Sequence, residues 1–172
     1  MQRLLPIQST DSDFLLKGDL TRAGCDLTLT FEIIDSKSFL QLPKPFLVLG
    51  ADASRRDGLW NDTCFEMFMK PENNEAYYEF NFSLSPAWNE YYFQKYRDPQ
   101  PPKPCQDILL KQMQWDGKKF QIELILENSK INFDIGLTAI LKEKSGAKHY
   151  LAIAHAGEKP DFHLAKSFIL KR

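Results

Sequence analysis

Apolar and polar residues alternate one by one in several short segments of this chain, and this pattern constrains the fold more than any other feature. Residues 77–84 read YYEFNFSL and residues 25–34 read CDLTLTFEII, so that every second side chain is apolar. A period of two residues is typical of a β-strand with one buried face. No segment keeps a helical period over three turns. The chain is therefore expected to be all-β with little helix.

Turn signals separate the strand-like segments. Asp116-Gly117 is the strongest hairpin signal in the chain, and a second hairpin is expected around Ser145-Gly146. The segment from Ala87 is expected to pair back on residues 77–84 after the SLSP turn. Further strand-like segments cover residues 46–52, 63–69, 87–97, 112–115, 118–126, 135–143, 149–155 and 167–172.

Many short strands joined by turns favour an antiparallel β-sandwich of the immunoglobulin-like or jelly-roll-like kind, because two sheets packed face to face bury both apolar faces. The 172 residues suit one domain spanning residues 1–172. The proline-rich stretch RDPQPPKPCQD, residues 97–107, is interpreted as a long loop crossing the end of the sandwich, because the chain after it is short for a second domain.

Charge and composition argue against several classes of protein, among them nucleic-acid-binding and membrane-spanning proteins. The net charge of -1 gives no overall attraction to nucleic acid or to an anionic membrane. The first residues lack the apolar core of a signal peptide, and no apolar run approaches the roughly 20 residues of a membrane span. Cys25, Cys64 and Cys105 match neither a disulfide framework nor a zinc motif. A cytoplasmic protein is the simplest expectation.

One carboxylate stands out because its sequence neighbours are apolar. Glu66 lies in TCFEMFM, a segment expected to form a central strand, and Tyr77, Glu79, Asn81 and Ser83 form a polar row on one face of another strand. If the two strands pair antiparallel, Glu66 joins this row. A buried carboxylate is costly unless it is hydrogen-bonded or faces a wet cleft. The row could line such a cleft, or it could be an ordinary solvated sheet face.

Two residues near this row could contact a ligand. Trp60 follows a glycine turn, where a tryptophan packs as a lid on the core or serves as a stacking platform. Arg97 could contact an anionic or sugar ligand, or form a salt bridge at the rim of the sandwich. A flat apolar ring beside polar groups suits a polyhydroxylated ligand.

The C-terminal loop and the two glutamates offer other chemistry. His155, Asp161 and His163 could bind a metal, act as acid–base groups or brace the loop by hydrogen bonds, but their spacing matches no metal motif. Glu66 and Glu79 could form the carboxylate pair of a glycosidase, although such pairs are common on adjacent strands without catalysis.

The segment DGLWNDTCFEMFMKPENNEAYYEFNFSLSPAWNEYYFQKYR, residues 57–97, resembles the DOMON-like relatives of the type 9 carbohydrate-binding module. Trp60, the strand Cys64–Phe68 and the strand residues Phe80–Phe82 occupy the places of the family's tryptophan, its V-E-I-F-I-like strand and its F-x-V-N-like strand. The stretch from Ala152 to Leu170 is similar to the family's closing strand, loop and strand.

The resemblance implies a β-sandwich in which two tryptophans clamp a sugar and polar groups of adjacent strands hold its hydroxyls. Trp60, Glu66 and Asn81 take over the matching positions. The chain departs from the family in two places. Glu79 stands where binding members have an arginine, and the second tryptophan has no counterpart, so that Phe162 or His163 would replace it.

The resemblance also raises two metal possibilities. Relatives hold structural calcium, for which no carboxylate cluster can be placed in this sequence. Other DOMON members bind haem through Met and His ligands, and Met67 or Met69 with His155 or His163 could be imagined in that role, although their spacing does not demand it.

We therefore predict a non-catalytic domain that binds a small carbohydrate or polyol in a cleft near Trp60, with no nucleic-acid or membrane partner. No cofactor is predicted, structural calcium stays possible, other metals are left open, and the sequence predicts no oligomeric state. The alternatives are an enzyme that uses carboxylate and histidine groups in the same cleft, and a structural domain whose sugar site has decayed. The predicted ligand-binding residues are Trp60, Glu66, Glu79, Asn81, Arg97, His155, Asp161, Phe162 and His163.

Overall fold

The structure is a computed structural model that describes residues 1–6, 14–98, 108–127 and 131–172. The loop predicted at residues 97–107 lies outside the described residues beyond Asp98. Within the described ranges, no helix is long and apolar enough to cross a membrane.

Strands dominate the described chain, and its helices are two single turns of 3-10 helix. The elements are β1 (Gln2–Pro6), β2 (Phe14–Ala23), β3 (Asp26–Asp35), β4 (Phe46–Leu49), β5 (Ser54–Arg55), η1 (Leu59–Asn61), β6 (Cys64–Pro71), β7 (Tyr77–Ser83), β8 (Ala87–Phe93), β9 (Ile108–Trp115), β10 (Lys119–Leu126), β11 (Phe133–Lys142), β12 (Lys148–Ala152), η2 (Ala165–Ser167) and β13 (Leu170–Lys171). The all-β class with little helix is confirmed.

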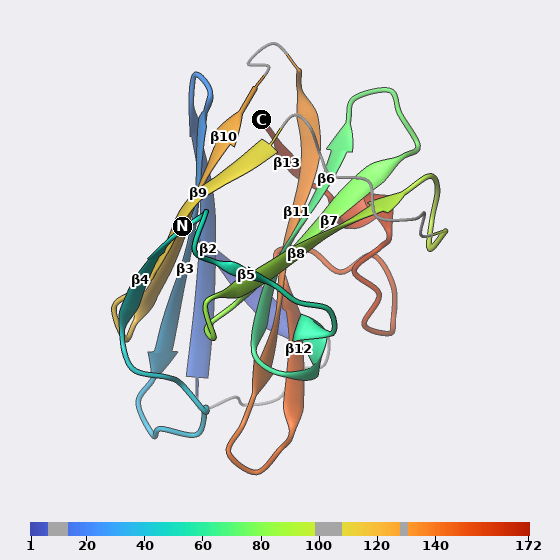
Figure 1. The fold of residues 1–172 in the computed structure, drawn as a ribbon. Coiled ribbons are helices and arrows are strands. Elements are labelled where there is room, and N and C mark those ends of the chain that lie inside the picture. Colours follow the sequence, from blue (N-terminus) through green and yellow to red (C-terminus); the bar gives the residue numbers. More distant parts are fainter. Residues whose placement is uncertain (7–13, 99–107, 128–130) are drawn as a thin grey trace.

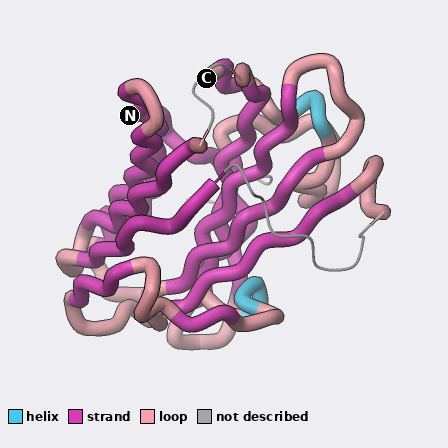
Figure 2. The backbone as a smooth tube through the Cα atoms, turned by 45° about the horizontal axis from the view of Figure 1, so that its top comes forward, coloured by secondary structure: helices cyan, strands magenta, loops and turns pink. Residues whose placement is uncertain are grey.

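The strands pair in one continuous, strongly curled sheet (Figures 1 and 2). Their order is β4-β9-β10-β3-β2-β1-β12-β11-β6-β7-β8-β5, and β13 pairs with β11 beside β12. Pairing is antiparallel except between β5 and β8. The two separate sheets expected from the sequence are not seen, because β1 joins the arms: Leu4 pairs with β2 while Leu5 pairs with β12.

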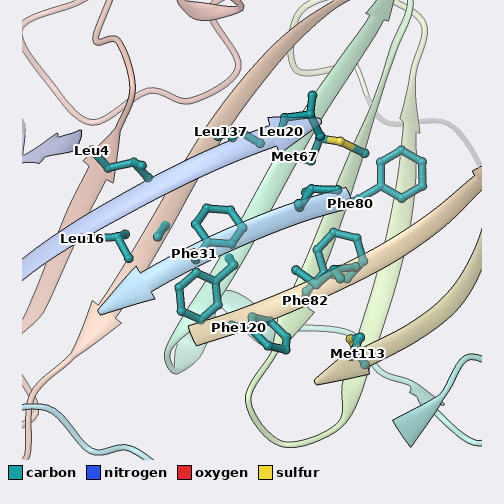
Figure 3. Close-up of a cluster of buried hydrophobic side chains, with 14 of the residues drawn as sticks. Leu4, Leu16, Leu20, Phe31, Met67, Phe80, Phe82, Met113, Phe120 and Leu137 are labelled. Carbon is teal, nitrogen blue, oxygen red and sulfur yellow. The ribbon is translucent and has the colours of Figure 1, made fainter. Parts of the chain in front are cut away.

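The main core lies between the two arms of the curled sheet. Figure 3 shows side chains from both arms meeting there. The ring of Phe65, from β6, lies 4.8 Å from that of Phe31 on β3 and 5.2 Å from that of Phe120 on β10. The apolar residues of the alternating 77–84 segment face this core as predicted: Phe80, Phe82 and Leu84 are buried in it, and Tyr78 packs against it while partly buried.

Strand pairing sets the register of the polar row. β6 and β7 are antiparallel, with Glu66 opposite Asn81 and Phe68 opposite Glu79. Side chains directly opposite one another share a sheet face. The expected joining of Glu66 to the row is therefore confirmed, and the row lies on the face of the sheet away from the main core.

The C-terminal segment leaves the sheet after β12 and returns as β13, at the other end of the same edge of β11. Between these strands, residues 153–169 pass over the outer face. Phe168 packs there against Gly136 of β11, where an added Cβ atom would come within 2.8 Å of the Phe168 ring. Gly136 therefore lets the ring approach the sheet closely.

Replacing Gly136 with alanine should lower the free energy of unfolding by about 1–3 kcal/mol, because the buried Phe168 ring must move to make room for the new methyl group. Urea unfolding measures this change. Gly157→Ala is the matched control, since its Cβ atom would meet Leu164 at an ordinary 3.4 Å. Equal stabilities of the two variants would contradict the close approach at Gly136.

Candidate functional site

A second apolar cluster lies on the outer face of the sheet. It consists of Phe68, Tyr77, Phe93 and Phe168, with Tyr91 and Phe162 packed against it. The rings of Tyr77 and Phe93 stack at 4.9 Å, and those of Phe68 and Phe168 stack at 5.5 Å. These aromatics come from β6, β7, β8 and the C-terminal segment, so the cluster anchors that segment on the sheet.

Hydrogen bonds also hold the C-terminal segment in place. The Tyr77 hydroxyl lies 2.9 Å from His163 Nδ1, and it accepts a hydrogen bond of 3.3 Å from the Arg97 backbone N–H. Asp161 accepts from the Arg97 guanidinium at 2.9 Å and from the Tyr96 hydroxyl at 2.5 Å. The loop after β8 and the C-terminal segment are thus tied together across the outer face.

A cavity of about 540 Å³ opens between these elements. This volume falls in the range of small-molecule sites, roughly 300–1,000 Å³. Glu66 and Glu79 are almost fully buried in its lining, whereas the Trp60 side of the cavity is open, with that residue 41% exposed. The lining residues are Trp60, Glu66, Phe68, Glu79, Tyr91, Phe93, Arg97, Ile140, Tyr150, Pro160, Phe162 and His163.

Six of the nine residues predicted for the site line this cavity. They are Trp60, Glu66, Glu79, Arg97, Phe162 and His163.

The other three predicted residues lie outside the lining. Asn81 is fully buried and donates from Nδ2 to Glu79 Oε1 at 2.9 Å, so it positions that carboxyl group. Asp161 holds Arg97 and accepts from the His163 backbone N–H at 3.2 Å. His155 has its ring 6.3 Å from that of Phe162 and its Nε2 2.7 Å from the backbone oxygen of Leu5.

The two buried carboxyl groups influence one another. Burial, and then the charge of Glu79, raise the pKa of Glu66 far above its usual range, against the hydrogen bond of 2.9 Å that Thr138 Oγ1 donates to Glu66 Oε2. Burial also raises the pKa of Glu79, opposed by the Asn81 hydrogen bond and the Arg97 charge. The pair therefore holds protons at a pH where exposed glutamates are ionised.

His163 and Tyr77 are neutral neighbours of the acids. Burial, with a smaller contribution from Arg97, lowers the pKa of His163 to about 4, and burial raises the pKa of Tyr77 to about 12. The neutral Tyr77 hydroxyl can donate to His163 Nδ1, which leaves the proton of the imidazole on Nε2. That atom faces Glu79 Oε2 at 3.7 Å.

Sequence reasoning missed the aromatic side of the cavity on β8. Tyr91 and Phe93 lie on the outer face of that strand, and the Tyr91 ring meets the Trp60 ring edge to face at 5.8 Å. The Tyr91 hydroxyl donates to Asp57 at 2.9 Å and accepts from Asn89 at 3.1 Å. The same alternation that placed Glu79 could have found Tyr91 and Phe93.

Among the residues that the structure describes, no group of three or more His, Cys, Asp or Glu side chains is placed to hold a metal ion. His155 and His163 also form hydrogen bonds with different groups, the Leu5 carbonyl and the Tyr77 hydroxyl respectively. A second hollow of about 450 Å³ lies at the η1 turn, lined by Asp57, Asp62 and Lys142 among others, and Trp60 is not part of its lining.

No protein-family model and no curated protein matches this chain. A solved structure does match in fold: a "putative carbohydrate-binding protein" from Bacteroides uniformis, with a TM-score of 0.64 and 13% sequence identity, over 98% of this chain and 83% of the other. At this level of identity the likeness shows the fold. Nearly the whole described chain therefore shares its arrangement with a structure to which carbohydrate binding has been attributed.

Proposed function

We propose that this protein is a non-catalytic domain that binds a small carbohydrate or polyol in the cavity beside Trp60. The observation that carries the proposal is the meeting, in one accessible cavity, of the exposed Trp60 indole and the buried carboxyl groups of Glu66 and Glu79. The carbohydrate-binding description of the structural neighbour supports it. The DOMON-like relationship and a cytoplasmic location belong to the same proposal and remain predictions from the sequence.

The chemistry of a sugar fits this combination of groups. A pyranose ring has an apolar face that stacks on an aromatic side chain, and its hydroxyls both donate and accept hydrogen bonds. A protonated carboxyl group can donate a hydrogen bond to a sugar hydroxyl, and an ionised one can accept a hydrogen bond from it. The open Trp60 side and the buried acids would then contact different faces of one ligand.

Replacing Trp60 with alanine should weaken sugar binding at least tenfold, because the stacking surface is lost while the buried acids stay in place. Calorimetry or NMR titration with a panel of mono- and disaccharides measures the change, with wild-type dissociation constants expected between about 1 μM and 1 mM. Phe39→Ala is the matched control, since Phe39 is 38% exposed and lies outside the cavity lining.

An unchanged affinity in Trp60→Ala, or no binding of any sugar by the wild type, would rule the proposal out. Weakening by Phe39→Ala to the same extent would show that the Trp60 effect is not local.

A second candidate function is acid–base catalysis in the same cavity. The observation in its favour is the raised pKa of both glutamates beside a neutral His163, since groups with shifted pKa values cluster at active sites. Turnover of a glycoside panel that disappears in Glu66→Gln or Glu79→Gln would favour this function. Sugar binding without turnover would favour the non-catalytic one.

A further inference from the structure

The acidic groups of the cavity have little positive charge to balance them. Its lining contains two carboxyl groups and one cationic side chain, Arg97, whose guanidinium is paired with Asp161 at 2.9 Å. No lysine of the described ranges contributes to the lining, and His163 is neutral at physiological pH. Within the described part of the chain, Glu66 and Glu79 thus lack a cation of their own.

Among the residues that the structure describes, each acid also has an oxygen to which no group donates a hydrogen bond. Glu66 is 3% exposed, and its one hydrogen bond within the described residues goes to Oε2, from Thr138. Glu79 is 7% exposed, and its Oε1 accepts a hydrogen bond from Asn81 Nδ2. Its Oε2 lies 3.7 Å from His163 Nε2, which is beyond hydrogen-bond distance. Both side chains line the cavity, so these free acceptor positions are open to a ligand that brings donors.

Aromatic rings surround the same space. Trp60, Tyr91, Phe93, Tyr150 and Phe162 all line the cavity, and the first two meet edge to face. Aromatic faces attract organic cations through their quadrupole, and the attraction grows when the cation is desolvated. Rings that enclose acidic groups are therefore suited to a positively charged organic ligand.

We propose that the ligand of this cavity is a protonated amino sugar, whose ammonium group donates to Glu66 and Glu79 while its ring stacks on Trp60. The inference rests on the proposed sugar-binding function and names the class of sugar. Ammonium–carboxylate hydrogen bonds are about twice as strong as neutral ones. A neutral hexose brings hydrogen-bond donors but no charge to these acids, whereas an amino sugar brings a cation to the place where the free oxygens lie.

Binding of a cation between the acids has a consequence that binding of a neutral sugar lacks. The ammonium charge stabilises both carboxylates, so a proton held by the pair is released when the ligand binds. The other charged or titratable groups that face the acids are Cys64, Tyr77, Tyr91, Arg97 and His163; Tyr150 lines the same cavity, and Asp161 lies outside the lining as the partner of Arg97. Of these, His163 and the tyrosines are already neutral, and Arg97 and Asp161 form their own pair.

The test compares amino sugars with their parents on the intact protein. Calorimetry with glucosamine, galactosamine and mannosamine, each beside its parent hexose and its N-acetyl form, is performed at a pH below that of amine deprotonation. At least one amine should bind ten times or more tighter than both neutral forms. Repeating the titration in buffers of different ionisation enthalpy should show proton release for that amine and none for its parent.

Glu79→Gln should abolish this preference, because it removes a charge and keeps the volume. Glu90→Gln is the matched control: Glu90 is also buried, lies on the opposite face of β8 and pairs with Arg55 at 2.9 Å. That variant should keep the preference. The proton-release measurement uses the wild type, so it decides the matter even where a variant folds poorly.

The possible outcomes separate the two proposals. Neutral hexoses that bind as tightly as the amines, without proton release, would overturn the amino-sugar inference and leave the sugar-binding function standing. Failure of every sugar would overturn both. Choline serves as a cation without a sugar ring, and its binding in place of all sugars would overturn the amino-sugar inference together with the sugar-binding function.

Discussion

Replacing Glu66 with glutamine should leave the stability of the protein nearly unchanged at pH 4.5 and make the variant more stable than the wild type at pH 9. Glutamine keeps the shape of the protonated acid. Burial and the charge of Glu79 raise the pKa of Glu66 above the ordinary value of 4.5. Between the two pKa values, the folded state therefore binds a proton that the unfolded state has lost. The stability that protonated Glu66 gives the folded state is lost as the pH rises from 4.5 through the raised pKa.

The size of the effect follows from linkage, since each unit of difference between folded and unfolded pKa is worth about 1.4 kcal/mol. We expect the free energy of unfolding of Glu66→Gln to exceed that of the wild type by about 2 kcal/mol or more at pH 9. His163 acts in the opposite direction, because its lowered pKa costs stability as the pH falls from 6.5 toward 4. His163 is present in both Glu66→Gln and the wild type, so its contribution cancels in the difference between their free energies of unfolding.

Urea unfolding at a series of pH values from 4.5 to 9 measures both curves. Glu90→Gln is the control and should show the opposite sign at neutral pH, because it removes the partner of Arg55. Curves for Glu66→Gln and the wild type that stay parallel would show that Glu66 does not carry its proton in the folded state.

The hairpins could be predicted because their signals are local. Gly117 and Gly146 have φ angles of 99° and 92°, in the region that favours glycine. Asp116 Oδ1 accepts the backbone N–H groups of Lys118 and Lys119, which closes the turn. All three predicted hairpins, β7–β8, β9–β10 and β11–β12, are present.

Strands β1 and β2 and the curl of the sheet could not be predicted in the same way. β2 alternates, but Gly18 interrupts its apolar face, because a Cβ atom there would lie 2.7 Å from the Leu4 side chain on β1. The need for glycine arises from a neighbouring strand and leaves no pattern in the segment itself. The sharing of β1 between β2 and β12 is also non-local, so one curled sheet and two sheets look alike in the sequence.

The same distinction applies to the site, where local patterns predict some of the residues and long-range contacts position the others. The period of two placed Glu66 and Glu79 on a common face, and an antiparallel pairing of their strands was enough to bring them together. The contacts of Arg97 with Asp161 and of Tyr77 with His163 span 64 and 86 residues. No local rule predicts such contacts, because they depend on the position of the C-terminal segment on the outer face of the sheet.

Replacing Phe168 with alanine should destabilise the protein by about 3–5 kcal/mol and remove ligand binding as well, because this ring anchors the C-terminal segment. Phe168 is buried, stacks on Phe68 at 5.5 Å and meets Tyr77 edge to face at 5.9 Å. Without it, the segment that brings Phe162 and His163 to the cavity loses its most deeply buried apolar side chain. The main core between the two arms does not include this ring.

Ile169→Ala is the matched control for this change. Ile169 is the next residue and its side chain is half exposed, so the loss of stability should stay within about 0.5 kcal/mol. Hydrogen exchange separates the two effects of Phe168→Ala: amides of residues 153–169 should lose protection more than those of β6 and β7. Uniform loss of protection across the sheet, or a loss of stability no larger than that of Ile169→Ala, would contradict the anchoring role, because a cavity wall held by the aromatic cluster must loosen before the strands beneath it.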